Sequence, residues 1–345
     1  MNVAMITPWG KNVRCGIRTY SESLVNALAK LGVDVYIVRY PRLGQRTPEL
    51  IESMVLDKIP VDKVDCLHVQ HEYGVFAPNL EGGFYAYLKR LGKPCITTMH
   101  AVGNFAVDKV VGGVSDKVVV HNEWCAGQFQ GDKSKVVVIP HGCLEPVDCP
   151  PAEECKKALG IDPRVPIVGY QGFISHPKGL EILIEAMTKV PNAALLIGGG
   201  WHVEVETDYI RHLKQWSLEV LKGRCMWLGY VPDERLATVY GAMDILCYPS
   251  IYASESGALL TGLSHGRATL ASAVPPFKEK EKLGVLMTFR DVPDLAGKIK
   301  RLLKDEALRH RLEEGARKYS ESVKWYPNIA QAHKSLYESV VEKHK

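Results

Sequence analysis

Residue types suited to binding a phosphorylated ligand gather first at 172–179 of this 345-residue chain, which reads Gly-Phe-Ile-Ser-His-Pro-Lys-Gly. The segment lies between an apolar run and a helical pattern, so Lys178 would stand at a helix N-terminus. A positive charge there opposes the helix dipole, and an anion held between the lysine and the helix amides would account for it. The other reading is an ordinary solvated surface lysine. We take the segment as a predicted anion site.

A second segment of the same kind covers 248–258 and reads Tyr-Pro-Ser-Ile-Tyr-Ala-Ser-Glu-Ser-Gly-Ala. It also joins a predicted strand to an apolar helix, with Glu255 just before the expected helix start. Glu255 either caps this helix or accepts hydrogen bonds from sugar hydroxyls. The amides of Ser256, Gly257 and Ala258 would face a diphosphate.

The loop at 8–17 connects the first predicted strand to the first helix and carries Gly10 and Gly16. Glycine at the mouth of a helix lets backbone amides approach a phosphate. The loop lacks the three-glycine dinucleotide fingerprint, and a purely structural turn is the more frequent role for such glycines.

Histidines and a carboxylate follow two further predicted strands. His100 ends the segment Thr-Thr-Met-His, and His71 and Glu72 end the segment His-Val-Gln-His-Glu. Two strand ends of this kind aimed into one cleft are typical of a joint site.

The elements that must position these residues alternate between strands and helices. In the first half, apolar runs predict strands at 3–7, 33–38, 66–69, 95–98, 117–120 and 136–139, with a helix at 19–31. In the second half, strands are predicted at 166–170, 194–197, 225–228, 245–248 and, as the last, 269–273. The helices between them are predicted at 179–190, 208–221, 233–242 and 257–265. Such alternation indicates parallel sheets covered on both faces, with ligands at the carboxyl ends of the strands.

The expected fold class is therefore α/β, with two doubly wound Rossmann-like domains facing a central cleft. Proline-rich composition predicts a linker at 146–165, containing a short helix at 152–159. The N-terminal domain would cover 1–145 and the C-terminal domain 166–327. A long helical tail at 294–344 is interrupted by Trp-Tyr-Pro at 325–327, and residues 328–345 would cross back to the first domain.

Composition is that of a soluble globular protein, with 46% hydrophobic and 24% charged residues and a net charge of +4. Nine cysteines without a two-residue spacing read as reduced thiols. Cys143, Cys149 and Cys155 recur near His141, but spare thiols are favoured over a zinc cluster. The N-terminus reads as a strand and no apolar run is long enough to cross a membrane. We expect a cytoplasmic protein, at most peripheral to a membrane; the aromatic and basic stretch at 84–90 fits an interfacial helix less well than a half-buried one.

Seven short motifs together resemble the retaining family 4 glycosyltransferases of GT-B fold. In order they are Cys-Gly-Ile-Arg-Thr-Tyr (15–20), Gln-His-Glu-Tyr-Gly-Val-Phe (70–76), Thr-Met-His (98–100), Ile-Pro-His-Gly (139–142), Gly-Phe-Ile with Lys-Gly (172–174, 178–179), Leu-Gly-Tyr-Val-Pro (228–232) and Ser-Glu-Ser-Gly-Ala-Leu-Leu (254–260). Each motif is modest, and their order and spacing carry the resemblance over nearly the whole chain. The variant is most similar to the mannosyltransferase-like branch.

The resemblance implies a donor site for a GDP- or UDP-linked hexose, of mannose or glucose type, and no other cofactor. Gly16 and Lys178 would hold the donor diphosphate, and Glu255 the hydroxyls of the donor sugar. Tyr230 and Val231 would lie near the nucleobase. The remaining donor-binding positions would be Phe173, Ser256, Gly257 and Ala258.

The resemblance also implies the reaction. His100 would sit beside the reacting sugar, and His71 and Glu72 would face the acceptor, a hydroxyl of a glycan or glycolipid. The family retains anomeric configuration, works without a metal, and lets the leaving phosphate take the acceptor proton. The sequence contains no Asp-x-Asp pair, which fits a metal-independent enzyme.

Two positions depart from the family pattern. The arginine that usually follows the glycine of the phosphate loop is Phe173 here, so Lys178 would carry more of the charge on the diphosphate. The second glutamate, expected to bind the ribose, is replaced by Thr261 and Gly262.

Three other functions were weighed. A transferase acting on modified bases of viral DNA would use the cluster of Arg39, Arg42 and Arg46, but the nearly balanced charge of the first domain disfavours it. The two departures would also fit a non-catalytic protein that binds a nucleotide-sugar. A nicotinamide dehydrogenase is disfavoured because the three glycines at 198–200 lack the dinucleotide spacing.

Overall fold

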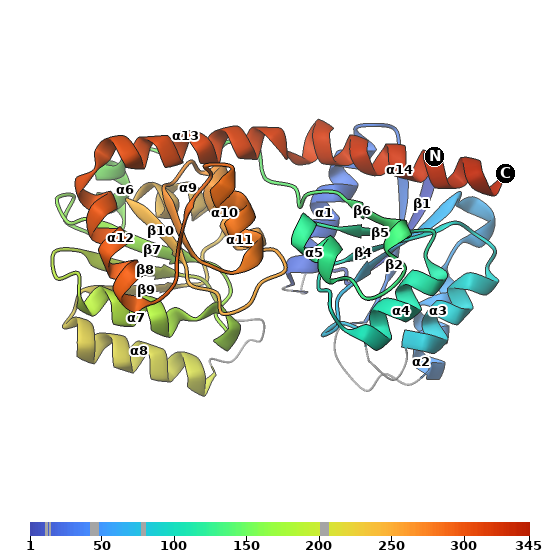
Figure 1. Ribbon diagram of the computed structural model, residues 1–345, viewed down its shortest axis with the longest axis horizontal. Coiled ribbons are helices and arrows are strands. Elements are labelled where there is room, and N and C mark those ends of the chain that lie inside the picture. Colours follow the sequence, from blue (N-terminus) through green and yellow to red (C-terminus); the bar gives the residue numbers. More distant parts are fainter. Residues whose placement is uncertain (11–12, 14, 42–47, 77–80, 201–206) are drawn as a thin grey trace. The chain divides into compact units, whose positions relative to one another are not determined.

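The computed structural model describes residues 1–10, 13, 15–41, 48–76, 81–200 and 207–345. The described chain divides into two compact units (Figure 1). Unit 1 is formed by Met1–Gly142 and Val323–Lys345, and unit 2 by Cys143–Ser322.

Unit 1 contains a six-stranded parallel sheet with the order β2-β1-β3-β4-β5-β6. Its strands are β1 (Asn2–Thr7), β2 (Asp34–Arg39), β3 (Cys66–His71), β4 (Cys95–Met99), β5 (Lys117–Val120) and β6 (Val136–Val138). Its α-helices are α1 (Gly16–Ala29), α2 (Pro48–Met54), α3 (Glu81–Arg90), α4 (Phe105–Val114), α5 (Glu123–Gln128) and α14 (Ala330–His344). Helices α1 and α14 cover one face of this sheet, and α3 and α4 cover the other (Figure 1).

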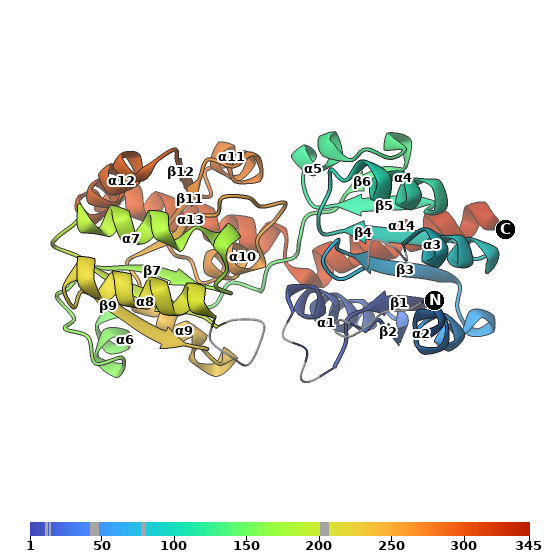
Figure 2. The same ribbon diagram turned by 90° about the horizontal axis from the view of Figure 1, so that it is seen from below.

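Unit 2 repeats the architecture, with the strand order β12-β11-β10-β7-β8-β9 and every pair parallel. Its strands are β7 (Ile167–Gln171), β8 (Ala194–Gly198), β9 (Cys225–Gly229), β10 (Ile245–Tyr248), β11 (Thr269–Ser272) and β12 (Met287–Phe289). Its helices are α6 (Ala152–Ala158), α7 (Leu180–Thr188), α8 (Asp208–Leu221), α9 (Asp233–Gly241), α10 (Gly257–Ser264), α11 (Pro275–Lys282), α12 (Val292–Lys304) and α13 (Glu306–Ser322). Figure 2 shows α7 and α8 beside the sheet of this unit from a second direction.

The sequence forms these elements because its apolar spacing matches each period. In α1, the buried residues Ile17, Tyr20, Leu24 and Leu28 recur every three or four positions, which places them on one helix face against the sheet. In β3, all six residues are buried, as expected for a central strand of a parallel sheet covered on both sides. Both predicted sheets are confirmed.

The structure corrects two expectations. The segment predicted as a linker is part of unit 2: Lys156 of α6 makes an ion pair of 2.8 Å with Asp244, ahead of β10. The strand at 269–273 is not the last, because β12 follows it at the sheet edge. The stretch at 84–90 forms the half-buried helix that the sequence favoured over an interfacial one, with Phe84, Tyr85 and Leu88 buried in the core of unit 1.

The C-terminal helical tail is broken twice. Asp305 separates α12 from α13, a break that the sequence analysis missed. Tyr326 has extended backbone angles before Pro327, and this interruption is the one predicted from the proline. The last helix, α14, packs against α1 within unit 1, where its Lys334 donates to the carbonyl of Leu31.

Candidate functional site

The strand order of unit 2 reverses between β7 and β10. From β7 the chain moves outward through β8 and β9, and then returns to the other side of β7 to form β10, β11 and β12. Ligands of open α/β sheets bind in the crevice at the carboxyl ends of the two strands that flank such a reversal. The loops that follow β7 and β10 are the two segments predicted from sequence to bind a diphosphate.

Glycines bring three loops at this edge of unit 2 into backbone contact. Gly172 has a φ of 156°, and a Cβ there would lie 2.9 Å from the Cβ of Ala258, after β10. A Cβ on Gly179 (φ 63°) would lie 2.2 Å from the carbonyl oxygen of Pro249. A Cβ on Gly199 (φ 132°), after β8, would lie 1.8 Å from the carbonyl oxygen of Gly172. No side chain larger than hydrogen fits at these three positions without moving a backbone.

Two buried tyrosines, Tyr170 and Tyr248, hydrogen-bond to the loops that follow β7 and β10. The Tyr170 hydroxyl donates to the carbonyl of Phe173 at 2.6 Å, and the Tyr248 hydroxyl donates to the carbonyl of Ala258 at 2.8 Å. Burial raises the pKa of both phenols above the ordinary value, so both remain donors. The loop after β7 is thereby held rigidly, and Phe173 contributes its carbonyl to that support.

Lys178 lies at the end of a short 3₁₀ turn (His176–Lys178), immediately before Gly179 and α7. Its side chain is half-buried, and burial lowers the pKa of its ammonium. Within the described ranges no hydrogen bond or ion pair to this ammonium is found. A partly desolvated cation at the N-terminal end of α7, whose cap Gly179 provides no side-chain acceptor, can bind an anion together with the helix amides.

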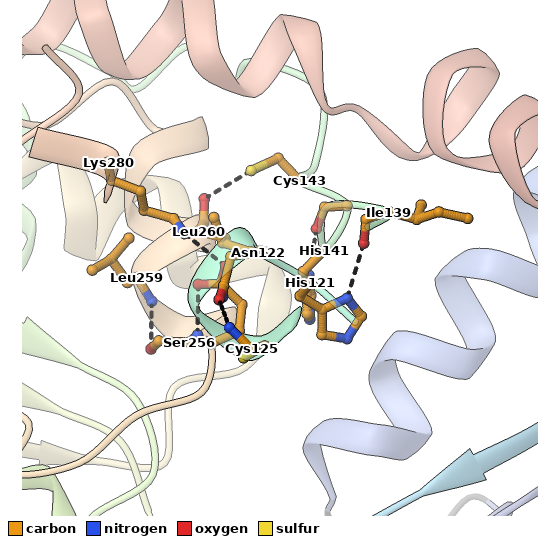
Figure 3. Close-up of polar contacts among 12 residues, drawn as sticks. His121, Asn122, Cys125, Ile139, His141, Cys143, Ser256, Leu259, Leu260 and Lys280 are labelled. Carbon is orange, nitrogen blue, oxygen red and sulfur yellow. Dashed lines mark hydrogen bonds and ion pairs between the residues drawn. The ribbon is translucent and has the colours of Figure 1, made fainter. Parts of the chain in front are cut away.

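Glu255 forms a buried ion pair that neither sequence-based reading included. It does not cap α10, because Ser256 does: the Ser256 hydroxyl accepts from the Leu259 amide at 3.3 Å (Figure 3). One carboxylate oxygen of Glu255 accepts from the Ser256 amide at 2.9 Å, and the other lies 2.6 Å from Nζ of Lys280. The two side chains are 5% and 4% exposed.

At the start of α10, one backbone amide is bonded to Glu255 and the next two have no partner within the helix. The Ser256 amide is taken by Glu255, so the prediction that it faces a diphosphate is wrong. Gly257 is exposed and Ala258 is half-buried at the start of the helix. The first amides of an α-helix have no partner within the helix, so these two can donate to a ligand.

The loop after β9 carries the residues predicted to meet a nucleobase. The Tyr230 ring is exposed and Val231 is buried beside it. Together they line a small pocket whose other walls are Leu228, Pro232, Arg235 and Val239. An exposed aromatic ring on an apolar floor suits stacking of a planar base.

In unit 1 the strand order reverses between β1 and β3, so the first loop lies at the corresponding edge. Gly16 is exposed as the first residue of α1, whose cap residue Cys15 makes no side-chain capping bond with any described residue. Residues 11, 12 and 14 of this loop lie outside the described residues. The N-terminus of α1 can therefore donate backbone amides to an anion, as predicted.

Four consecutive strands of unit 1 are each followed by a histidine at the carboxyl edge. His71 ends β3, His100 follows β4, His121 follows β5 and His141 lies beyond β6. The ring of Tyr20, from α1, lies edge-on to His100 and His141 at 4.7 and 5.0 Å between centroids. The imidazoles of His100, His121 and His141 are in ring contact in sequence order, at 5.2 and 5.4 Å between centroids.

His100 has both ring nitrogens engaged inside unit 1. Its Nε2 lies 2.9 Å from the side-chain oxygen of Gln70, and its Nδ1 lies 3.4 Å from Nε2 of His121. Burial, and then the neighbouring histidines, hold the pKa of His100 well below its usual range. The imidazole is therefore neutral at pH 7, and a side-chain contact with a sugar would have to replace one of these two bonds.

Of the two residues predicted to face an acceptor, His71 is buried and Glu72 is half-buried. The His71 ring is 0% exposed, stacks on Phe76 and lies 3.1 Å from the Tyr85 hydroxyl, so it cannot touch an acceptor. Burial lowers its pKa to about 3. The Glu72 carboxylate turns back to accept from the Gly74 amide at 2.8 Å and supports its own loop. The prediction for His71 is wrong, and Glu72 carries a structural bond.

Three site residues escaped the sequence analysis. Gln70 points inward from β3 and contacts His100. His121 follows a four-residue strand, which is the same signal that singled out His100. Lys280 could not be found this way, because nothing in the sequence links a lysine of α11 to Glu255 25 positions earlier.

Other groups singled out in the sequence have local roles. The thiols of Cys143, Cys149 and Cys155 each contact a backbone carbonyl within unit 2. The Arg39 guanidinium would lie 3.4 Å from a Cβ on Gly10. Arg42 and Arg46 lie outside the described residues.

Comparison with known proteins gives a family match that lies within unit 2. Residues 151–319 match the family model of glycosyl transferases group 1. The match supports membership of this glycosyltransferase group and covers both the loop after β7 and the Glu255 segment. A D-inositol 3-phosphate glycosyltransferase of Corynebacterium jeikeium is 27% identical over 198 residues, covering 54% of this chain and 47% of that protein. The chain spans about half the length of the curated relatives it matches.

Solved structures share the whole fold. Sucrose-phosphate synthase from Thermosynechococcus elongatus superimposes with a TM-score of 0.81 at 21% identity, covering 99% of this chain and 100% of that one. HepE of Anabaena, solved in complex with UDP and glucose, gives 0.79 at 15% identity, covering 98% and 100%. The two-unit α/β architecture is therefore the GT-B fold that these structures share.

Among the described helices, none combines the length and the apolar character needed to cross a membrane.

Proposed function

We propose that this protein transfers a hexosyl group, of mannose or glucose type, from a GDP- or UDP-linked donor to a hydroxyl acceptor in glycan or glycolipid assembly. The reaction would retain the anomeric configuration and belong to family 4. The observation that carries the proposal is the convergence of the loops after β7, β8 and β10 at the strand reversal of unit 2, beside the half-buried Lys178.

The donor diphosphate would bind in this convergence. Lys178 would neutralise the charge, and the amides of Gly257 and Ala258 would donate to the phosphate oxygens. Phe173 supplies no cation where relatives of this family carry arginine, so the single ammonium matters more here. Tyr230 would stack on the base, and Val231 would form the floor beneath it.

The donor sugar would lie against Glu255. Lys280 and the Ser256 amide fix the carboxylate in one orientation, so a negative charge stays at a fixed position. A fixed acceptor of this kind selects sugar hydroxyls without having to reorganise when the ligand binds.

The chemistry that this arrangement supports is departure of the diphosphate from an oxocarbenium-like sugar. Stabilising the leaving group is the largest task in such a step, and preorganised amides with a desolvated lysine perform it best in a water-poor site. Within this proposal the leaving phosphate takes the proton of the acceptor hydroxyl.

Donor binding tests the proposal directly. We expect UDP, GDP, UDP-glucose and GDP-mannose, titrated by calorimetry, to include a binder whose affinity falls about 10- to 100-fold in Lys178→Ala, the worth of one charge-assisted hydrogen bond. Lys189→Ala is the matched control, because Lys189 lies exposed at the opposite end of α7. Equal affinities of the two variants would remove the phosphate assignment.

Turnover separates an enzyme from a protein that only binds. The best donor is offered with inositol 3-phosphate, 2-deoxystreptamine and a lipid-linked sugar, since relatives are described by the first two acceptors. Proton NMR of the product would report the anomeric configuration. Tight donor binding without transfer to any hydroxyl would favour the non-catalytic alternative, and inversion would exclude family 4 chemistry.

A further inference from the structure

A line of buried and half-buried polar groups crosses the sheet of unit 1 from α14 to the end of β6. We name it the imidazole chain, and its members are Tyr337, His68, Gln70, His100, His121 and the carbonyl of Ile139. Successive contacts measure 2.7 Å (Tyr337–His68), 3.2 Å (His68–Gln70), 2.9 Å (Gln70–His100), 3.4 Å (His100–His121) and 3.2 Å (His121–Ile139). Figure 3 shows the last of these contacts, between His121 and Ile139.

One end of the imidazole chain has a fixed direction. The carbonyl of Ile139 can only accept, so Nδ1 of His121 must carry a proton. A neutral His121 then has a lone pair on Nε2, and His100 must donate to it through Nδ1–H. A neutral His100 in turn has its lone pair on Nε2, which points at Gln70.

Gln70 is the member that can satisfy this requirement. Its amide reaches His100 at 2.9 Å and His68 at 3.2 Å, and rotation of the amide by 180° exchanges nitrogen and oxygen while keeping both distances. With the amide nitrogen toward His100, Gln70 donates to His100. Its oxygen then accepts from Nε2–H of His68, which also lies 2.8 Å from the Thr98 hydroxyl. The Tyr337 hydroxyl then donates to Nδ1 of His68, and every group in the line has its partner.

With the amide oxygen toward His100, the line needs one more proton. His100 must then donate through Nε2, and its Nδ1 lone pair faces Nε2 of His121. A hydrogen bond at that contact needs one more proton, either on Nε2 of His121 or on Nδ1 of His100, and that ring is then an imidazolium. The orientation of the Gln70 amide thus determines whether the imidazole chain carries a positive charge.

We infer that the imidazole chain holds His100 as a neutral imidazole protonated on Nδ1, and that Gln70 is the positioning residue that enforces this by donating to Nε2. The groups that face His100 are Tyr20 from α1, His68 and His71 from β3, and His121 and His141 from the ends of β5 and β6. Burial and the neighbouring histidines lower the pKa of His100 in the same direction.

The effect of a neutral His100 on catalysis rests on the proposed function. An oxocarbenium-like sugar carries positive charge, and an imidazolium beside it would raise the energy of the transition state. When the hydrogen bonds of the imidazole chain all run in one direction, every ring is neutral and no imidazolium lies beside the sugar. Gln70 would therefore act on the reaction through His100, without touching the substrate.

Nuclear magnetic resonance of the wild-type protein tests the tautomer without any activity assay. With ¹⁵N-labelled histidine at pH 7.5, two-bond ¹⁵N–¹H correlation spectra distinguish the protonated from the unprotonated ring nitrogen, and His100→Phe assigns the signals. We expect His100 and His121 both to be neutral and protonated on Nδ1. A His100 ring protonated on Nε2, or an imidazolium at either residue, overturns the inference.

Gln70→Glu then tests the role of the amide. An ionised carboxylate cannot donate, so it accepts from His100 and favours the imidazolium; we expect the His100 titration to move up by at least one pH unit. Under the proposed function, kcat then falls about tenfold for each pH unit below the new pKa. Tyr337→Phe is the matched control, because it removes a buried hydroxyl at the far end of the line. The His100 tautomer should not change in that variant.

The outcomes separate the two claims. The predicted tautomers in a protein without transferase activity would uphold the imidazole chain and refute the proposed function. Transferase activity together with a His100 protonated on Nε2 would do the reverse. Should Gln70→Glu fail to fold, the wild-type spectra still decide the inference.

Discussion

The ion pair between Lys280 and Glu255 makes the sharpest prediction about stability. Lys280→Met keeps the length and apolar stem of the side chain and removes only its charge. Because both side chains are about 5% exposed and lie 2.6 Å apart, the variant leaves a carboxylate buried without its partner. Breaking a buried pair in this way costs about 3–5 kcal/mol.

Urea unfolding monitored by tryptophan fluorescence measures this cost, since unit 2 contains Trp216 and Trp227. With a slope of about 2 kcal/mol per M, the midpoint of the unit 2 transition should drop by about 1.5–2.5 M. Lys282→Met provides the control, because Lys282 lies exposed at the end of the same helix. That variant should unfold within about 0.5 kcal/mol of wild type.

A double-mutant cycle checks that the cost comes from the pair. Glu255→Gln alone should also destabilise, since it buries Lys280 without a counter-charge. The double variant Glu255→Gln/Lys280→Met should be more stable than either single one, because it leaves no buried charge. Additive effects in the cycle, or a Lys280→Met protein as stable as the control, would refute the reasoning.

The remaining predictions concern acid stability and loop packing. Burial lowers the pKa of His71 from 6.5 to about 3, so between these values the unfolded state binds one more proton than the folded state. The free energy of unfolding should therefore decrease by about 1.4 kcal/mol for each pH unit by which the pH falls from 6.5 towards 3. Urea unfolding from pH 8 to 4 should show a weaker dependence of this free energy on pH in His71→Phe, and an unchanged dependence would contradict the assignment. Gly199→Ala should cost at least about 1–3 kcal/mol through its backbone angle alone, and more through its contact with Gly172, and should abolish donor binding in calorimetry. The neighbouring Gly200→Ala should be tolerated, because the new Cβ would lie no closer than 3.6 Å to another atom, the Cβ of Tyr230. Equal effects of the two substitutions would refute the packing argument.

The sequence predicted the fold well because its signals were local. Apolar runs of four to six residues between helical patterns identify strands without any tertiary information, and eleven of the twelve strands were expected near their observed bounds. The missed strand, β12, has three residues and follows a charged helix, so its pattern is too short to register. The linker was misjudged because its prolines indicate irregular backbone, while its packing against unit 2 depends on Lys156 finding Asp244, far along the chain.

The site was only partly predictable, for a related reason. Backbone features followed from sequence position: glycine between a strand and a helix identified the loops that meet at the strand reversal of unit 2. Side-chain states did not, since burial decides them. His71 was expected at a surface, and the sequence gives no sign that Phe76 and Tyr85 would enclose it. Glu255 was read as a cap or a sugar ligand because its buried partner, Lys280, comes from another helix.

The central claim is that a donor diphosphate binds at the strand reversal of unit 2, and a crystal structure with a bound nucleoside diphosphate tests it most directly. The account predicts phosphate oxygens within hydrogen-bond distance of Nζ of Lys178 and of the Gly257 or Ala258 amide, with the base against Tyr230. A diphosphate bound elsewhere, with Lys178 turned to solvent, would contradict it.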